Sequence, residues 1–129
     1  MRALLIRQPW IGPILAGKKT WEIRGSRTSI RETIGLISSG SGTVIGVCEL
    51  VDCVGPLTVE EFIENAQNAG MRPDEAKLGW YRKSYAWVLE IPRILQRPVP
   101  YAHPHGAIIW VRLDGSAERE IQEQLRNSH

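Results

Sequence analysis

The sequence lacks any long hydrophobic run, and this absence excludes an integral membrane protein built on helices. No apolar stretch approaches the ~20 residues that a membrane span requires. The apolar start, Met1–Ile6, is too short for a signal peptide, and no small-residue cleavage site follows it. We therefore expect a cytoplasmic protein with no membrane partner.

Cysteine is also scarce, which argues against a disulfide scaffold or a zinc site. Cys48 and Cys53 lie in one apolar stretch, and their odd spacing in a strand would point them to opposite faces of a sheet. That geometry is poor for a disulfide, and neither residue has a partner at zinc-ligand spacing. Both are expected to act as small hydrophobic residues, and the sequence predicts no metal and no cofactor.

The overall composition is that of an ordinary globular protein. The chain has 129 residues, of which 43% are hydrophobic and 23% are charged, so residues 1–129 are expected to form a single domain. Charge is distributed unevenly: residues 1–31 carry a balance of +6, residues 32–79 carry −6 and residues 80–129 carry +2. This asymmetry suggests a basic face suited to phosphates, unless the segments interleave in space and cancel.

The hydrophobic pattern predicts a mixed α/β (α+β) fold. Strands are expected over residues 2–6, 20–24, 35–38, 43–54, 84–90 and 106–113. Helices are expected over residues 9–18, 58–70, 73–81 and 117–126, the second with a capping box from Thr58 to Glu61. The strands do not alternate with long helices, which disfavours a doubly wound sheet. A small barrel or strongly bent sheet, capped by short helices, fits better.

Polar side chains that could take part in binding or catalysis are densest between Gly17 and Arg24, where a predicted helix is followed by a predicted strand. Glu22 and Arg24 share one face of that strand, and Lys19 stands at its entry. Arginine suits phosphates and base edges, and glutamate can accept from an exocyclic amine. Trp10 could supply a ring for base stacking nearby. The alternative is a surface ladder of ion pairs beside a core tryptophan.

Two motifs in these segments resemble the ASCH domain family. Gly17–x–Lys19–x–x–Glu22–x–Arg24 matches its G-x-K-x-x-E-x-R signature, and Ile6–Arg7–Gln8–Pro9–Trp10 is similar to its Gln-Pro-Trp opening, with Leu5 where serine is common. The resemblance spans roughly residues 3–112. It implies a PUA-like β-barrel capped by helices, with a cleft that contains the signature and binds RNA, DNA or a modified nucleoside.

The first functional hypothesis is therefore an RNA- or nucleotide-binding module. Basic residues would position phosphates, namely Arg7, Lys18, Lys19, Arg24, Arg27 and Arg31. Trp10 would stack on a base, and Glu22 or Gln8 would read its edge. Trp87 could line the cleft or belong to the core.

The second hypothesis is an enzyme, either an amidohydrolase of the N4-acetylcytidine type or a ribonuclease. The resemblance implies a catalytic role for Lys19, with Glu22 as its partner where the amidohydrolase members have threonine. Those members also use a glutamate from the middle region. The candidates here are Glu60, Glu61, Glu64, Asp74 and Glu75, and none can be matched.

Two further clusters have open roles. His103 and His105 flank Pro104 and could contact a ligand or serve the structure. The aromatic and basic segment 80–83 could extend a nucleic-acid track or end a helix. The oligomeric state and the choice between polymer and free nucleoside stay open.

Overall fold

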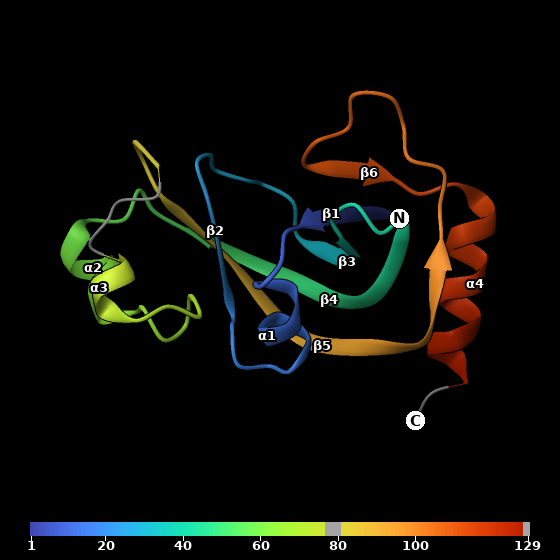
Figure 1. The fold of residues 1–129 in the computed structure, drawn as a ribbon, viewed down its shortest axis with the longest axis horizontal. Coiled ribbons are helices and arrows are strands. Elements are labelled where there is room, and N and C mark those ends of the chain that lie inside the picture. Colours follow the sequence, from blue (N-terminus) through green and yellow to red (C-terminus); the bar gives the residue numbers. More distant parts are fainter. Residues whose placement is uncertain (77–80, 128–129) are drawn as a thin grey trace.

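Six strands form one sheet in the order β2-β5-β4-β3-β1-β6 in the computed structural model, which describes residues 1–76 and 81–127 (Figure 1). The strands are β1 (Arg2–Ile6), β2 (Trp21–Arg24), β3 (Glu32–Ser38), β4 (Thr43–Val54), β5 (Tyr85–Pro100) and β6 (Trp110–Arg112). The helices are α1 (Ile11–Leu15), α2 (Val59–Glu64), α3 (Pro73–Ala76) and α4 (Gly115–Arg126). Only β1 and β3 pair in parallel among these strands. The predicted α+β class is confirmed.

The two longest strands, β4 and β5, bend where they pair with each other. Their register shifts at three places, which are Val44/Gly46, Val47/Glu49 and Leu50/Asp52. Each irregularity interrupts the ladder and increases the local twist of the strands. The sheet therefore curls around its core instead of lying flat, which confirms the predicted bent sheet.

Helix α1 packs closely on the concave side of this curl. A Cβ at Gly46 would collide with the side chain of Leu15 and lie 2.8 Å from the carbonyl oxygen of Arg93. The missing side chain thus lets the helix approach β4. This contact places the turn after α1, and with it Lys19, over the sheet.

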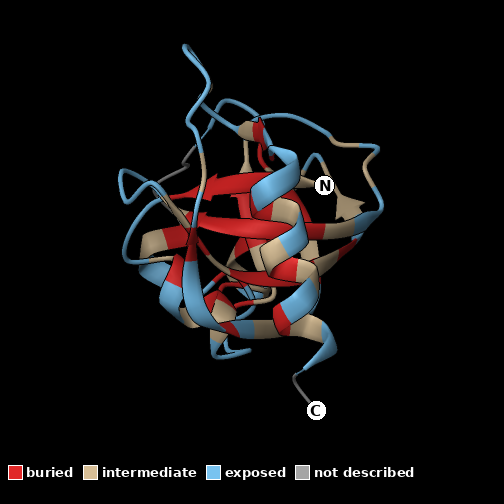
Figure 2. Cartoon of the chain, turned by 90° about the vertical axis from the view of Figure 1, so that its right-hand side faces the viewer, coloured by how far each residue is buried: buried red, intermediate tan, exposed pale blue. Residues whose placement is uncertain are grey.

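The core divides into three clusters along the curl. The central cluster packs α1 against β1, β3, β4 and β5, and includes Leu36 and Trp87. A second cluster lies beneath α4, which turns Ala117 and Ile121 inward and its exposed residues outward (Figure 2). A third cluster packs α2 and α3 against β2 at the other end of the molecule (Figure 1).

The bounds of several elements differ from the prediction, although β1 and β4 match it. Strand β5 continues to Pro100, ten residues beyond the predicted end. The ladder with β4 skips Ile91 and Pro92, so the missing N–H of Pro92 falls in an irregular stretch where no partner is needed. The alternation from which the strand was predicted ends at Glu90, before this irregular stretch.

The predicted helix over residues 9–18 shrinks to α1, because Gly17 ends the turn with a φ of +76°. The predicted strand over residues 106–113 shrinks to β6, since only three of its residues pair with β1. The residues before β6 form a loop. The predicted helix over 73–81 is observed as α3, and its continuation at residues 77–80 lies outside the described residues.

The predicted capping box is confirmed: Thr58 accepts from the amide of Glu61, whose side chain accepts from the amide of Thr58. Helix α4 begins earlier than predicted because Asp114 caps it.

Both cysteine thiols are free, as expected, with Cys48 buried and Cys53 half-buried. Among the described helices, none has the length and apolar character needed to cross a membrane.

Candidate functional site

A cleft of about 970 Å³ opens beside β2, between the end of β1, the β3–β4 loop and the loop that precedes β6. Six of the residues singled out in the sequence line it, namely Arg7, Trp10, Lys19, Glu22, Arg24 and Trp87. Three cations thus face one carboxylate in a single hollow. The volume is in the range of small-molecule sites.

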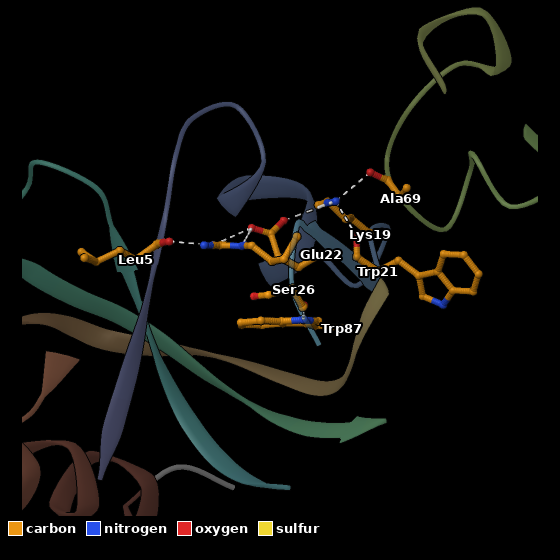
Figure 3. A network of polar contacts seen from close by, with 8 residues as sticks. Leu5, Lys19, Trp21, Glu22, Ser26, Ala69 and Trp87 are labelled. Carbon is orange, nitrogen blue, oxygen red and sulfur yellow. Dashed lines mark hydrogen bonds and ion pairs between the residues drawn. The ribbon is translucent and has the colours of Figure 1, made fainter. Parts of the chain in front are cut away.

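Lys19, Glu22 and Arg24 form a buried ionic triad at the floor of this cleft (Figure 3). The Oε2 atom of Glu22 accepts from Nε of Arg24 at 3.1 Å and from its Nη2 at 2.8 Å. The Oε1 atom lies 3.5 Å from Nζ of Lys19. The three side chains are only 1%, 8% and 15% exposed, in chain order. The predicted convergence of these groups is therefore observed.

The ammonium group of Lys19 has acceptors on every side. It donates to the carbonyl oxygens of Trp21 and Ala69, the latter at 2.7 Å, and it lies 5.2 Å from the ring centre of Trp10. With Glu22 as third acceptor, its three donors are all directed at protein atoms. Burial lowers the pKa of Lys19 below its ordinary value, and the carboxylate of Glu22 opposes that shift.

Arg24 is held by protein atoms on the other side of Glu22, although it is less buried than Lys19. Its Nη2 atom also donates to the carbonyl oxygen of Leu5 at 2.8 Å, and its guanidinium lies 5.5 Å from the ring centre of Trp87. Trp87 is fixed in turn, because its Nε1 donates to the carbonyl of Ser26 at 2.9 Å and its ring stacks on Trp110 at 5.7 Å. The guanidinium therefore links β2 to β1 and serves the architecture of the floor.

Local sequence rules explain the arrangement of the triad. Alternation along β2 puts Glu22 and Arg24 on one face, and Glu22 pairs with Trp87 in the β2–β5 register. Lys19 follows the turn made by Gly17. On its other side, Gly70 adopts a φ of +71°, and a Cβ there would lie 3.1 Å from the Lys19 side chain. The absent side chain lets the segment after α2 close over the lysine.

The rim of the cleft carries the exposed groups. Arg7 is exposed, and its guanidinium has no partner in the part of the chain that the structure describes. Tyr81 is 46% exposed and lies over Gly25, where a Cβ would come within 2.8 Å of its ring. Residues Ser39, Gly40 and Gly42 of the β3–β4 loop also line this edge.

His103 joins the rim as part of the loop before β6. Its Nε2 lies 3.0 Å from the carbonyl oxygen of Ala107 and its Nδ1 lies 3.0 Å from the hydroxyl of Tyr101. A carbonyl can only accept, so Nε2 carries the proton and, in the neutral ring, Nδ1 accepts from Tyr101. His105 does not line the cleft, and no three His, Cys, Asp or Glu side chains of the described residues gather as metal ligands.

Four of the candidate ligand-binding residues fall outside the lining of the cleft, namely Gln8, Lys18, Arg27 and Arg31. Gln8 donates weakly to Ser38 at 3.5 Å, Lys18 is exposed to solvent, and Arg27 lies 5.0 Å from the ring centre of Tyr85. The middle-region carboxylates also lie elsewhere, namely Glu60, Glu61, Glu64, Asp74 and Glu75. Within the segment 80–83, Trp80 lies outside the described residues, and Tyr81 lines the cleft but Arg82 and Lys83 do not.

Sequence reasoning missed Tyr101 and the glycine loop of the rim, although it did single out the segment that contains Tyr81. Tyr81 and Tyr101 come from segments far from the signature, and only the curl of the sheet brings them together. The basic N-terminal segment also interleaves in part with the acidic middle segment. Arg2 pairs with Glu32 at 3.2 Å, and Arg31 lies 4.0 Å from Asp52.

Comparison with known proteins places this geometry in context. The model of the ASCH domain family matches residues 4–98. The crystal structure of an ASCH protein from Zymomonas mobilis superposes with a TM-score of 0.72 at 15% identity, covering 95% of this chain and 93% of that one. A point variant of that protein gives 0.72 at 17% identity, covering 95% and 96%. No curated protein matches the sequence significantly.

Proposed function

Because the chain belongs to the ASCH domain family, we propose that its cleft binds single-stranded RNA through one nucleotide held on the ionic triad. One observation carries the proposal. The same hollow presents the exposed ring of Tyr81, two half-buried aromatic rings, an unpaired arginine and a carboxylate whose charge is balanced by two neighbouring cations. Single-strand recognition uses this combination of stacking surfaces and cations.

Tyr81 supplies the most exposed ring beside the triad. One side of the ring rests on the backbone at Gly25, and the side chain as a whole is 46% exposed. A base that stacks on it would lie above the carboxylate floor. Tyr101 and Trp10, both half-buried, bound the same space.

Glu22 is suited to recognise the edge of that base. An ionised carboxylate offers about four acceptor positions, and the described contacts use two on Oε2 and one on Oε1. One position remains for a donor on the ligand. The exocyclic amine of adenine, cytosine or guanine would satisfy it, whereas a base edge with acceptors only would be repelled.

Binding can be tested by intrinsic tryptophan fluorescence with short homopolymeric RNA oligonucleotides. We expect Tyr81→Ala to weaken binding about 5- to 150-fold, which corresponds to the ~1–3 kcal/mol of one stacked base. Ile94→Ala is the matched control, since Ile94 is exposed and lies outside the cleft. Absence of binding by the wild type, or equal affinity of the two variants, would contradict the proposal.

A second candidate function is hydrolysis of a modified nucleoside, and the lowered pKa of Lys19 favours it. Burial makes the neutral amine easier to reach than it is in an exposed lysine, and a neutral amine is what a general base requires. Incubation of the protein with N4-acetylcytidine tests this, with cytidine as the expected product. Turnover should disappear in Lys19→Arg. If the wild type cleaves RNA, loss of that cleavage in Lys19→Arg would distinguish a ribonuclease that depends on Lys19 from a contaminating nuclease.

A further inference from the structure

We propose that the cleft holds a single phosphate group of its nucleotide at the rim, between the guanidinium of Arg7 and the Ser39–Gly42 segment of the β3–β4 loop. The inference rests on the proposed function and specifies how the nucleotide is oriented in the cleft. The base would lie over the ionic triad, and the sugar would lead to the phosphate at the rim.

Elimination among the cations of the cleft points to Arg7. Lys19 directs its three donors at two carbonyls and Glu22, and Arg24 engages Glu22 and the carbonyl of Leu5 through its Nε and Nη2 atoms. Lys19 cannot turn to a phosphate without leaving a buried partner unpaired, which is costly, and Arg24 has only its Nη1 atom to offer, from a side chain that is 15% exposed. Arg7 has no such partner among the described residues and is exposed. An arginine fork binds phosphate oxygens with two parallel hydrogen bonds.

The β3–β4 loop stands next to this arginine. The amide of Ser39 donates to the carbonyl of Ile6 at 2.9 Å, which fixes the start of the loop beside the residue that precedes Arg7. The Nε2 atom of Gln8 reaches the hydroxyl of Ser38 at 3.5 Å on the same side. The loop and the guanidinium thus belong to one edge of the cleft.

The backbone of the loop is open to a ligand. Gly40 and Gly42 have φ values of +84° and +71°, and a Cβ at either would meet no atom within 4 Å. Their amides have no acceptor within the described ranges, and neither does the hydroxyl of Ser39. Backbone amides in such left-handed turns form concave anion sites, and glycine leaves room for phosphate oxygens to approach them.

One phosphate contact has a measurable consequence for the salt dependence. For single strands, log affinity falls with log salt at a slope of about −0.7 for each neutralised phosphate. A slope of about −0.7 is expected here, in contrast to about −4 if the six basic residues named in the first hypothesis all contacted phosphates.

The test compares the four ribonucleosides with their 5′- and 3′-monophosphates, and with inorganic phosphate, by calorimetric titration. We expect at least one monophosphate to bind about 10- to 100-fold more tightly than its nucleoside, in line with the ~1.5–3 kcal/mol of a hydrogen bond to a charged group. Arg7→Gln should remove that advantage of the monophosphate over its nucleoside. Lys18→Gln, with the same charge change outside the cleft, should preserve it.

The outcomes separate this inference from the proposed function. If a nucleoside binds as tightly as its monophosphates, or if the Arg7 and Lys18 variants behave alike, the phosphate site is wrong and the base site stands. A salt slope steeper than about −2 would likewise overturn a single phosphate contact. If inorganic phosphate alone competes at the same affinity as the nucleotides, the site is a general anion site and the inference fails. If no nucleoside, nucleotide or oligonucleotide binds, the proposed function fails with it.

Discussion

Replacing Glu22 by glutamine is the most informative test of how the cleft floor is held together. The carboxylate lies between Lys19 and Arg24, and all three side chains are at most 15% exposed. The substitution keeps the size of the side chain and removes its charge. Two cations then remain in the floor with no counter-charge.

The expected loss of stability follows from that burial. Removal of one partner from a buried ion pair typically costs about 3–5 kcal/mol. We expect about 3 kcal/mol here, because the amide oxygen can still accept from Arg24 and that guanidinium is partly exposed. For a domain of this size the melting temperature would fall by about 10 °C.

The pH dependence gives the prediction a second, independent readout. The pKa of Lys19 in the folded protein lies below the ordinary 10.5, since burial lowers it. Between the two pKa values the unfolded chain binds more protons, so stability rises with pH across that interval. Glu22 opposes the shift, and its loss lowers the pKa of Lys19 further. The penalty of Glu22→Gln should therefore be largest near neutrality and shrink as the pH approaches 10.5.

Urea denaturation, followed by tryptophan fluorescence at several pH values, measures both effects. Glu64→Gln is the matched control, because Glu64 is exposed and has no ion pair within the described part of the chain. A Glu22→Gln variant within 0.5 kcal/mol of the control, about the scatter expected of surface substitutions, would show that the triad contributes no net stability. A gap that stays constant with pH would show that Lys19 does not feel the carboxylate.

Three further results are expected. Gln124→Leu should cost about 2–4 kcal/mol of unfolding free energy, because the buried side-chain amide of Gln124 accepts from the N–H of Arg97 and donates to its carbonyl. The control variant Gln122→Leu should be nearly neutral. Trp87→Phe should cost about 1–2 kcal/mol through the lost indole hydrogen bond, measured by thermal denaturation. Cys48, whose pKa burial raises to about 12, should resist a thiol reagent at neutral pH until the protein unfolds; prompt labelling would contradict its burial.

Local patterns were sufficient to find the strands and the chemistry of β2. Strand β4 is rich in β-branched residues that are apolar on both faces, and it lies at the centre of the sheet with the predicted bounds. The alternation of Glu22 and Arg24 predicted their shared face because side chains alternate in any strand. The capping box at Thr58 was equally local, since its two hydrogen bonds join residues three apart.

The extent of β5 could not be predicted from a local pattern. Pro92, Pro98 and Pro100 each lack an N–H, which normally ends a strand inside a sheet. The strand continues because register shifts with β4 accommodate Pro92 and Pro98, while Pro100 is its last residue, and those shifts depend on a partner about 45 residues away. A prediction from the pattern of one segment alone cannot include the pairing of β5 with β4.

The sequence by itself determined which side chains could do the chemistry: Lys19, Glu22 and Arg24 lie close enough along the chain for local geometry to bring them together. Only the tertiary structure decided which charges remain free for a ligand. The carbonyls of Ala69 and Leu5, which come from distant segments, accept from Lys19 and Arg24 and hold both in the floor, whereas Arg7 stays exposed with no partner among the described residues. Whether a charged group is available depends on what folds against it, and that is a property of the packed chain.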